Sequence, residues 1–312
     1  MVDVAVTGGS GFIGSHVVDA LLAAGHRVRV LDLRPPHRPE ADWLPVDILD
    51  VPALTTALNG AEFVYHLAAM ADVNDVVADP VDAVQVNVTG TAAVLEAARR
   101  AAAGRVILAS TVWVYSASLS QEVDEEACFA PSTDRHLYAT TKIAAEMICR
   151  DYWTLYRRPY TVLRYGIPYG PRMREALVIC TFIRRALTGE PLILSGGGTQ
   201  VRYFVYVEDL ARAHVLAMAP VAENRTYNLE GPRPVSIREI AEGVRALVGE
   251  QVRIEVGPGR TGDLAPKRVS AQRAWQELGW RPEVDFAEGL RRSFAWYRQK
   301  LEREAAIGAG DD

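Results

Sequence analysis

The chain begins with an apolar, β-branched run that passes through a glycine-rich turn directly into a helical pattern. The run at residues 2–6 suits a buried strand, and Gly8, Gly11 and Gly14 follow it at G-x-x-G-x-x-G spacing. Glycines at this spacing permit a tight turn, close approach of the backbone to a pyrophosphate, and close packing of the helix on the strand. The helix N-terminus then directs free N–H groups and a positive dipole end toward the phosphates. We therefore predict a dinucleotide site here; a strand-to-helix turn without a ligand is the alternative.

The first half of the chain alternates short β-branched runs with helical patterns. We expect strands at residues 2–6, 27–31, 44–47, 62–67, 105–109 and 160–164, and helices at residues 12–24, 51–58, 80–103 and 136–156. This alternation is typical of an α/β fold with a doubly wound parallel sheet, the Rossmann architecture. Residues 1–165 are expected to form the dinucleotide-binding domain. Residues 166–304 are expected to form a smaller, mixed α/β substrate domain, with later segments returning to the sheet, before a disordered tail at 305–312.

An acidic residue ends the second expected strand. Asp32 follows the glycines by about twenty residues, where a carboxylate accepts hydrogen bonds from an adenosine ribose. A 2′-phosphate would be repelled there, so we expect NAD, although the neighbouring Arg34 leaves NADP open. A solvated carboxylate at a strand end is the alternative interpretation. Asp47 and Ile48 follow the third expected strand, and we expect them beside the adenine.

The composition excludes several classes of partner. The 312 residues carry a net charge of −5 and no strongly basic run, so we do not expect nucleic acid as a partner. No apolar run is long enough to cross a bilayer, and the first expected strand leaves no room for a signal peptide. The histidines and the three cysteines are scattered, so we expect reduced thiols, a cytoplasmic location and no metal site.

A tyrosine and a lysine lie four residues apart in the helix expected at 136–156. Tyr138 and Lys142 therefore point to the same side of that helix. An ammonium near a phenol favours the phenolate, which takes a proton from a hydroxyl at neutral pH. Thr111, at the end of the preceding strand, brings a hydroxyl toward the same substrate oxygen. We interpret the three residues as a site for hydride transfer between an alcohol and a nicotinamide. For Tyr138 and Lys142 taken alone, a chance pair of surface side chains is the alternative.

Further motifs accompany these along nearly the whole chain. They stand at residues 7–14, 32, 47–48, 66–69, 87–91, 114–115, 138–142, 163–165, 169–172, 202, 206–209 and 278–280. In these motifs the chain resembles an extended short-chain dehydrogenase/reductase of the NAD-dependent nucleotide-sugar epimerase and dehydratase family, and within it the UDP-glucose 4-epimerase-like members. The resemblance implies NAD in the Rossmann domain and a nucleoside-diphosphate sugar in the C-terminal domain. It also implies a homodimer that pairs through the helices at 81–103 and 136–156.

The resemblance also assigns roles to individual residues. Thr111, Tyr138 and Lys142 match the family's catalytic residues. It implies a cofactor site lined by Gly8, Gly11, Phe12, Ile13, Gly14, Asp32, Arg34, Asp47, Ile48, Leu67, Ala68, Ala69, Asn87, Ala109, Tyr138, Lys142 and Tyr165. It implies a substrate site with Thr111, Trp113, Ile167, Arg202 and Arg260. The two arginines match those that bind the nucleotide diphosphate through their planar guanidinium groups; a surface salt bridge is the alternative for each. His66 is expected to be a packed histidine beside the cofactor.

Departures from the family pattern bear on the reaction and on the substrate. The 4,6-dehydratases carry Asp-Glu directly after the catalytic threonine, and the decarboxylases carry a glutamate at the second of these positions; Val112 and Trp113 stand here instead. Neither side chain titrates, whereas epimerisation needs no further acid or base. Trp113 either stacks on a sugar, narrows the pocket or fills the core. The family's Phe-Asn-x-Tyr-Gly pattern begins here with Gly166 and Ile167, and Ile167 cannot donate a hydrogen bond.

We therefore predict an NAD-dependent 4-epimerase of a nucleoside-diphosphate sugar, of the UDP-hexose or UDP-hexuronate type. In that reaction Tyr138 would deprotonate the 4-hydroxyl while NAD takes the C4 hydride, the 4-keto sugar would turn over in the pocket, and the hydride would return to its other face. A nucleotide-sugar 4-ketoreductase that uses exchangeable NAD(P)H fits the same residues. A cofactor-binding regulatory protein that has kept only the fold is a third reading, which the intact trio disfavours. The sequence leaves the nucleotide base and the sugar open.

Overall fold

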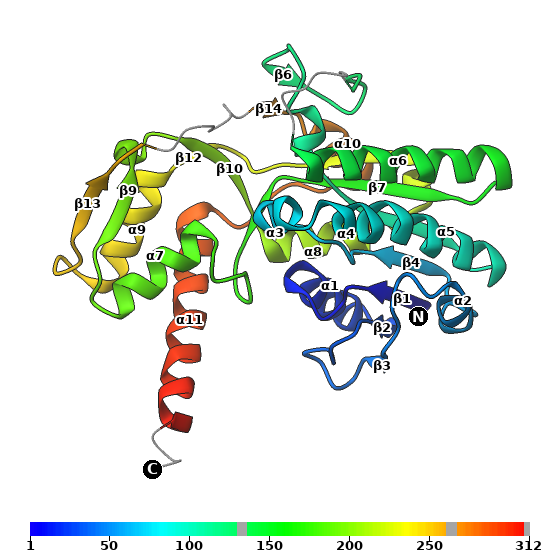
Figure 1. The fold of residues 1–312 in the computed structure, drawn as a ribbon, viewed down its shortest axis with the longest axis horizontal. Coiled ribbons are helices and arrows are strands. Elements are labelled where there is room, and N and C mark those ends of the chain that lie inside the picture. The colour runs from blue at the N-terminus through cyan, green and yellow to red at the C-terminus, as the bar shows by residue number, and fades with distance from the viewer. Residues whose placement is uncertain (130–135, 260–266, 309–312) are drawn as a thin grey trace. The chain divides into compact units, whose positions relative to one another are not determined.

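The computed structural model describes residues 1–129, 136–259 and 267–308 of the chain (Figure 1). The chain divides into two compact units, each built from more than one segment. Unit 1 comprises Met1–Gly166, Leu210–Glu230 and Lys267–Arg281. Unit 2 comprises Ile167–Asp209, Gly231–Pro266 and Pro282–Asp312. The sequence after residue 166 is therefore shared between the two units.

Unit 1 is built on a seven-stranded sheet in which every neighbouring pair of strands is parallel. The strands are Asp3–Thr7 (β1), Arg27–Leu31 (β2), Asp42–Leu44 (β3), Phe63–His66 (β4), Arg105–Thr111 (β5), Tyr160–Tyr165 (β7) and Arg225–Leu229 (β11). Their order is β11-β7-β5-β4-β1-β2-β3. The chain winds outward from β1 in both directions, which confirms the doubly wound Rossmann arrangement. Ligands of such sheets bind over the carboxyl ends of the strands, near the place where the winding reverses.

Helices connect these strands and cover both faces of the sheet (Figure 1). They are Phe12–Ala23 (α1), Val51–Ala57 (α2), Val73–Ala78 (α3), Pro80–Val84 (α4), Gly90–Arg100 (α5), Leu137–Tyr156 (α6), Val207–Leu216 (α8), which begins in unit 2, and Gln272–Leu278 (α10). Short 3-10 turns lie at Val112–Tyr115 and Pro220–Ala222, and Glu122–Val123 (β6) pairs in parallel with Arg268–Val269 (β14).

The alternation of side chains along β4 shows how the two faces are filled. Val64 belongs to a buried apolar cluster that also contains side chains of α2, α5 and α6. The hydroxyl of the next residue, Tyr65, donates to the carbonyl of His214 in α8 at 3.2 Å. Because successive side chains of a strand point to opposite faces, α8 covers the face opposite to α2, α5 and α6.

Unit 2 is a smaller, mixed α/β unit. Its strands are Ile167–Tyr169 (β8), Leu192–Ser195 (β9), Val201–Tyr206 (β10), Pro234–Ser236 (β12) and Ile254–Gly257 (β13); its helices are Val178–Leu187 (α7), Ile237–Val248 (α9) and Phe286–Gly308 (α11), with a 3-10 turn at Gly196–Gly198. Strand β10 pairs with β8 in parallel and with β12 in antiparallel orientation, and β13 pairs with β9 in parallel. The three helices pack against one another.

Three expected elements differ from the structure. The strand expected at 44–47 is β3, which ends at Leu44 because Pro45 has no N–H group for the ladder. The helix expected at 80–103 is interrupted by the π-helical turn Gln85–Thr89 between α4 and α5. The tail expected to be disordered at 305–312 is helical as far as Gly308. An ion pair between Lys300 and Glu304 at 3.6 Å and two alanines favour this extension of α11. Residues 309–312 lie outside the described part.

Candidate active site

The glycine turn lies at the carboxyl end of β1. Gly8 has a φ of +71°, and a Cβ atom there would lie 2.6 Å from the backbone nitrogen of Ala68. A Cβ atom on Gly14 would lie 2.1 Å from the carbonyl oxygen of Gly8. The turn and the close packing of α1 on β1 therefore both require glycine. Gly11 is the N-cap of α1, and within the described residues no side chain caps this helix, so its first N–H groups suit an anion such as a pyrophosphate.

Asp32 joins the glycine turn to the segment after β2. Its two carboxylate oxygens accept hydrogen bonds from the backbone N–H groups of Ser10, at 3.1 Å, and of Arg34, at 3.0 Å. The Ser10 hydroxyl also donates to the carbonyl of Arg34, 2.7 Å away. Each carboxylate oxygen retains a second lone pair for a ribose hydroxyl. The residues present therefore fit a dinucleotide whose adenosine ribose carries no phosphate.

The remaining predicted cofactor residues near this turn follow the neighbouring strands or begin α1. The half-buried ones are Phe12, Ile13, Leu67, Ala68 and Ala69. Asp47 accepts a hydrogen bond from the backbone N–H of Leu49 at 2.9 Å. Ile48 is 8% exposed and packs beside Gly90, where a Cβ atom would lie 2.6 Å from its Cδ1 atom. The side chain of Ile48 therefore belongs to the core, and little of it remains for contact with an adenine.

His66, the last residue of β4, is buried with a partner on each ring nitrogen. Its Nδ1 atom lies 2.8 Å from the hydroxyl of Thr7, and its Nε2 atom lies 3.1 Å from the hydroxyl of Thr91. Thr91 donates its proton to the Asn87 carbonyl at 2.7 Å, so it accepts from Nε2–H, and Nδ1 accepts from Thr7. Burial, followed by the charge of Lys142, lowers the pKa of His66 to about 3. His66 is therefore a neutral, structural histidine.

Asn87 lies in the π-helical turn and is engaged by the chain itself. Its Oδ1 atom accepts from the backbone N–H of Met70 at 2.8 Å. Its Nδ2 atom donates to the Met70 carbonyl at 2.9 Å and to the Thr141 hydroxyl at 3.1 Å. Asn87 thus fixes the segment after β4 against α6, which brings that segment close to Tyr138 and Lys142.

The expected catalytic side chains come from the end of β5 and the first turns of α6. Thr111 is the last residue of β5 and is buried, and its hydroxyl accepts from the backbone N–H of Trp113 at 3.2 Å. Lys142 Nζ lies 5.9 Å from the ring centroid of Tyr138 and donates to the carbonyl of Ala109 at 3.1 Å. The structure thus brings Tyr138 and Lys142 together, with Lys142 anchored to the strand that ends in Thr111.

Lys142 retains its charge at neutral pH despite its burial. Burial lowers its pKa to about 8, and the carboxylate of Glu146, one turn further along α6, opposes this change. The side chain is therefore an ammonium below about pH 8, as a cation that stabilises a phenolate must be.

Tyr165, which we expected beside the cofactor, lies opposite Thr111 in the register of β5 and β7. It is buried, and its hydroxyl lies 2.6 Å from Nε2 of His214. Because Nδ1 of His214 contacts the Leu210 carbonyl at 2.8 Å, Nε2 is the acceptor and Tyr165 the donor. The hydroxyl of Tyr165 is therefore directed to α8.

An aromatic series that the sequence did not predict begins at Trp113 and leads to Tyr138. His136 stacks on Tyr138, with ring centroids 6.1 Å apart and planes 26° apart. Its ring also contacts Trp113, with centroids 5.5 Å apart. His136 is the N-cap of α6, and its Nδ1 atom accepts from the N–H of Ala139 at 3.4 Å. Its position directly before a helical pattern was the one signal in the sequence for this N-cap role. Histidine is not among the preferred N-cap residues, so the signal was weak.

A buried ion pair and its hydrogen-bond partners join α6 to the strands that carry the expected catalytic residue Thr111 and its neighbour Tyr165. Glu146 is fully buried and accepts from Arg164 at 2.9 Å and 2.6 Å, and from the hydroxyl of Ser110 at 2.6 Å. The guanidinium also donates to the Tyr115 hydroxyl, which in turn donates to Asn228 at 2.9 Å. These bonds tie α6 to β5 and β7, the strands that end in Thr111 and Tyr165.

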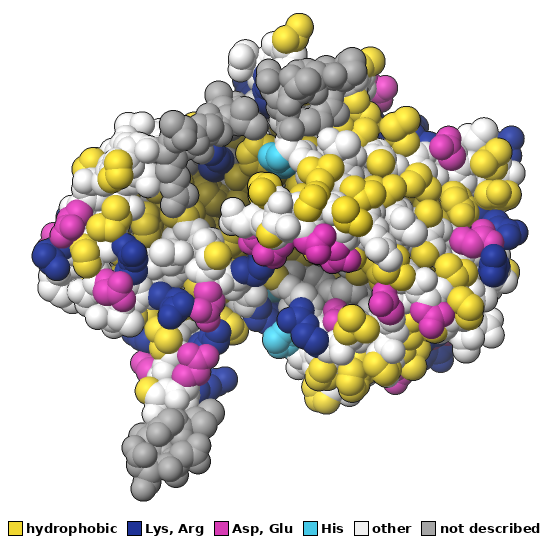
Figure 2. Space-filling view, in the orientation of Figure 1, with side chains coloured by type: hydrophobic (Ala, Val, Ile, Leu, Met, Phe, Trp, Pro, Cys, Tyr) yellow, Lys and Arg dark blue, Asp and Glu magenta, His cyan; other side chains and the backbone are white. Residues whose placement is uncertain are grey.

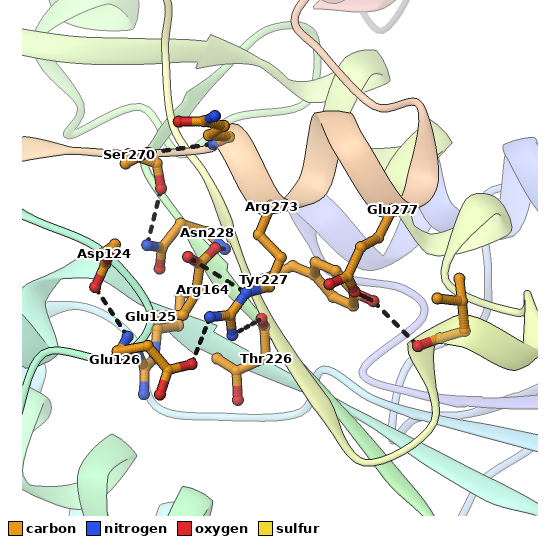
Figure 3. A network of polar contacts seen from close by, with 12 residues as sticks. Asp124, Glu125, Glu126, Arg164, Thr226, Tyr227, Asn228, Ser270, Arg273 and Glu277 are labelled. Carbon is orange, nitrogen blue, oxygen red and sulfur yellow. Dashed lines mark hydrogen bonds and ion pairs between the residues drawn. The ribbon is translucent and has the colours of Figure 1, made fainter.

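The polar network continues into the later segments of unit 1 (Figure 3). The backbone N–H of Asn228 donates to Glu125 at 2.8 Å, and its side-chain amide donates to the Ser270 carbonyl at 3.0 Å. Arg273 contacts Glu126 at 2.5 Å and the carbonyl of Thr226 at 3.4 Å. Segments that are far apart in the sequence are thus held together by polar contacts, of which the bond between the backbone of Asn228 and Glu125 is buried.

The expected substrate residues are not all in one unit. Thr111 and Trp113 belong to unit 1, whereas Ile167 and Arg202 belong to unit 2. Arg202 lies on β10, and its guanidinium donates to the Val201 carbonyl at 2.8 Å. Arg260 lies outside the described residues. The roles of these residues in substrate binding stay predictions.

Exposed apolar side chains gather over the helices that we expected to pair in a dimer (Figure 2). On α4 and α6, within the expected ranges, they include Val81, Val84, Met147 and Leu155; Val77 on α3 lies just before these ranges. No helix in the described ranges is long and apolar enough to span a bilayer. In the same ranges, no three His, Cys, Asp or Glu residues are grouped as metal ligands would be.

Comparisons with known proteins agree over almost the whole chain. A family model described as the NAD-dependent epimerase/dehydratase family matches residues 4–229. The UDP-glucose 4-epimerase of Mycolicibacterium smegmatis is 34% identical, over 95% of this chain and 98% of its own length. The UDP-N-acetyl-alpha-D-glucosaminuronate decarboxylase of Bacillus cytotoxicus is 30% identical, over 94% of this chain and 97% of its own length.

Solved structures show the same similarity. A Thermotoga maritima UDP-glucose 4-epimerase with UDP-glucose has a TM-score of 0.87 and 32% identity, over 96% of this chain and 99% of that chain. A Bacillus cereus UDP-glucuronic acid 4-epimerase with UDP-glucuronic acid and NAD has a TM-score of 0.86 and 28% identity, over 95% and 99%. A Streptomyces venezuelae dTDP-glucose 4,6-dehydratase with NAD has a TM-score of 0.86 and 30% identity, over 95% and 97%. Three reactions are thus found among proteins similar to this chain.

Proposed function

This chain belongs to the NAD-dependent epimerase/dehydratase family, and we propose that it is a 4-epimerase of a nucleoside-diphosphate sugar. The observation that carries the proposal is the placement of Tyr138 and Lys142 beside the end of β5, where Thr111 stands. NAD is the cofactor of this family, and when bound it accepts a hydride from the sugar carbon and returns it. The glycine turn and Asp32 fit its pyrophosphate and its unphosphorylated ribose.

The side chains of this chain supply the proton chemistry. Tyr138, as a phenolate, takes the proton of the 4-hydroxyl group, and Lys142 stabilises that phenolate by its charge. The Thr111 hydroxyl donates a hydrogen bond to the same sugar oxygen and holds it near Tyr138. Once the 4-keto sugar has turned in the site, Tyr138 returns the proton to the oxygen.

The residues after Thr111 favour epimerisation over the other reactions of the family. Dehydration requires a further acid and base, and decarboxylation in this family uses a glutamate; Val112 and Trp113 provide neither group. The half-buried Trp113 instead forms an aromatic surface with His136. Reduction of a 4-keto sugar by exchangeable NAD(P)H uses the same trio, so it is the second candidate.

Turnover without added cofactor tests the proposed reaction. We expect the purified protein to carry NAD and to interconvert the 4-epimers of a UDP-hexose or a UDP-hexuronate in its absence, measured by chromatography of the nucleotide sugars. The assay should include UDP-glucose, UDP-glucuronate, UDP-N-acetylglucosamine and dTDP-glucose. Net consumption of NADH or NADPH with a 4-keto sugar, and no epimer formed, would support the ketoreductase instead.

The glycine turn gives a second prediction, on cofactor binding. We expect Gly8→Ala to lower NAD affinity by tenfold or more and to destabilise the protein by about 1–3 kcal/mol, because the new Cβ atom meets the backbone of Ala68. Gly25→Ala is the matched control, since Gly25 has a φ of +80° but nothing within 4 Å of its Cβ position. Calorimetric titration with NAD and thermal unfolding check both. Equal NAD affinity in the two variants would contradict the assignment of the turn.

A further inference from the structure

A buried carboxylate at the end of β11 takes no part in the proposed chemistry. Glu230 is 5% exposed and directly follows β11. Thr111, Tyr165 and Leu229 pair in register across β5, β7 and β11. Glu230 therefore stands one position beyond the row that contains Thr111 and two strands away from it, which is about 10 Å at the usual strand spacing.

The strand order indicates which ligand lies near Glu230. The glycine turn follows β1 and Asp32 follows β2, whereas β7 and β11 lie beyond β5 on the other side of the sheet. Ligands of a doubly wound sheet lie over the carboxyl ends of its strands. With the dinucleotide over β1 and β2 and the reacting group at Thr111, the ends of β7 and β11 are left to the rest of the substrate.

Glu230 occupies this place because residue 166 has no side chain. A Cβ atom on Gly166 would lie 2.1 Å from Oε1 of Glu230 and 3.3 Å from its Cα atom. The family pattern has phenylalanine at the position of Gly166 and asparagine at that of Ile167. An aromatic ring at position 166 would therefore exclude the carboxylate of Glu230 from its present place. The next position has Ile167 and so offers no side-chain amide.

We propose that Glu230 selects the sugar of the substrate. Its carboxylate accepts hydrogen bonds from the hydroxyl groups of a neutral hexose, or from the ammonium group of an amino hexose. A hexuronate would place a second carboxylate in the same partly desolvated region, where like charges repel strongly. The inference rests on the proposed function and narrows its substrate to nucleoside-diphosphate hexoses that carry no acid group.

Binding of two UDP-sugars that differ in one acid group tests this selection. The NAD-loaded, full-length protein is titrated with UDP-glucose and with UDP-glucuronate by calorimetry. We expect the wild type to bind UDP-glucose about tenfold more tightly or better, a difference typical of one unfavourable charge pair. Glu230→Gln should reduce that ratio to about threefold or less, chiefly through tighter binding of UDP-glucuronate.

Two further variants make the result specific. Gly166→Ala displaces the carboxylate and should change the ratio in the same direction, so the test does not depend on the folding of one variant. Glu223→Gln removes the same charge before the opposite end of β11 and should leave the ratio within about twofold, because its charge is remote and screened. An unchanged ratio in both Glu230→Gln and Gly166→Ala, or a wild type that prefers UDP-glucuronate, would overturn the inference. Failure to bind any of the four nucleotide sugars of the turnover assay would instead contradict the proposed function.

Discussion

Tyr138→Phe is expected to lower kcat for epimerisation by about 10²–10⁴-fold, the usual contribution of a positioned acid or base. The variant keeps the ring that stacks on His136 and loses only the hydroxyl that we propose to move the proton. We therefore expect NAD content and thermal stability to remain close to those of the wild type. The rate is measured by following the interconversion of UDP-glucose and UDP-galactose at saturating substrate, or of the preferred UDP-sugar pair found in the cofactor-free assay.

Tyr156→Phe is the matched control for this experiment. Tyr156 lies in the last turn of the same helix and is 50% exposed, so the same substitution should leave kcat within about twofold. A Tyr138→Phe enzyme with the rate of the wild type would remove Tyr138 from the mechanism. A lower rate together with loss of bound NAD would instead indicate that the hydroxyl serves the cofactor site.

Glu146→Leu is expected to destabilise the protein by about 3–5 kcal/mol, because it leaves the guanidinium of Arg164 buried without its counter-ion. The Glu146 carboxylate also holds Ser110, which precedes Thr111, so the variant should lose activity even where it remains folded. Urea unfolding followed by circular dichroism measures the change in stability.

Two comparisons isolate the buried charge as the cause. Glu96→Gln removes a carboxylate that also bonds two arginines, Arg99 and Arg100, but at the surface, and it should cost less than about 1 kcal/mol. The double variant Glu146→Leu with Arg164→Met removes both buried charges and should recover much of the lost stability. A similar loss for Glu96→Gln and Glu146→Leu would refute this explanation.

The parts of the site that follow from local pattern were predictable from the sequence. The spacing of the glycine turn is visible in the chain, and the close approach of Gly14 to Gly8 lies within one strand–turn–helix unit, although Gly8 also contacts the backbone of Ala68 after β4. The four-residue separation of Tyr138 and Lys142 places both on one side of any helix that contains them. The carboxylate of Asp32 at a strand end is predictable for the same reason, since the position depends on counting along one βαβ unit.

The features that were missed depend on tertiary contacts. The π-helical turn accompanies bonds from Asn87 to Met70, a residue in another segment. The place of Glu230 depends on Gly166, far away in sequence but adjacent across two paired strands. Strand β11 has a polar and apolar mixture that carries no clear periodicity, and only its pairing with β7 makes it a buried strand. Such relations arise when distant segments meet, so no local window contains them.

The division of unit 1 into three segments has a consequence for synthesis of the chain on the ribosome. Strand β7 ends at Tyr165, but its outer neighbour β11 begins only at Arg225, and the Lys267–Arg281 segment that completes the unit comes later still. At translation rates of roughly 5–20 residues per second, the edge of β7 stays unpaired for several seconds after it emerges. During that interval the nascent chain presents an open, apolar strand edge, the kind of surface on which misassociation begins. For this protein, the edge of β7 is therefore covered only when the later segments of the same chain have been synthesised.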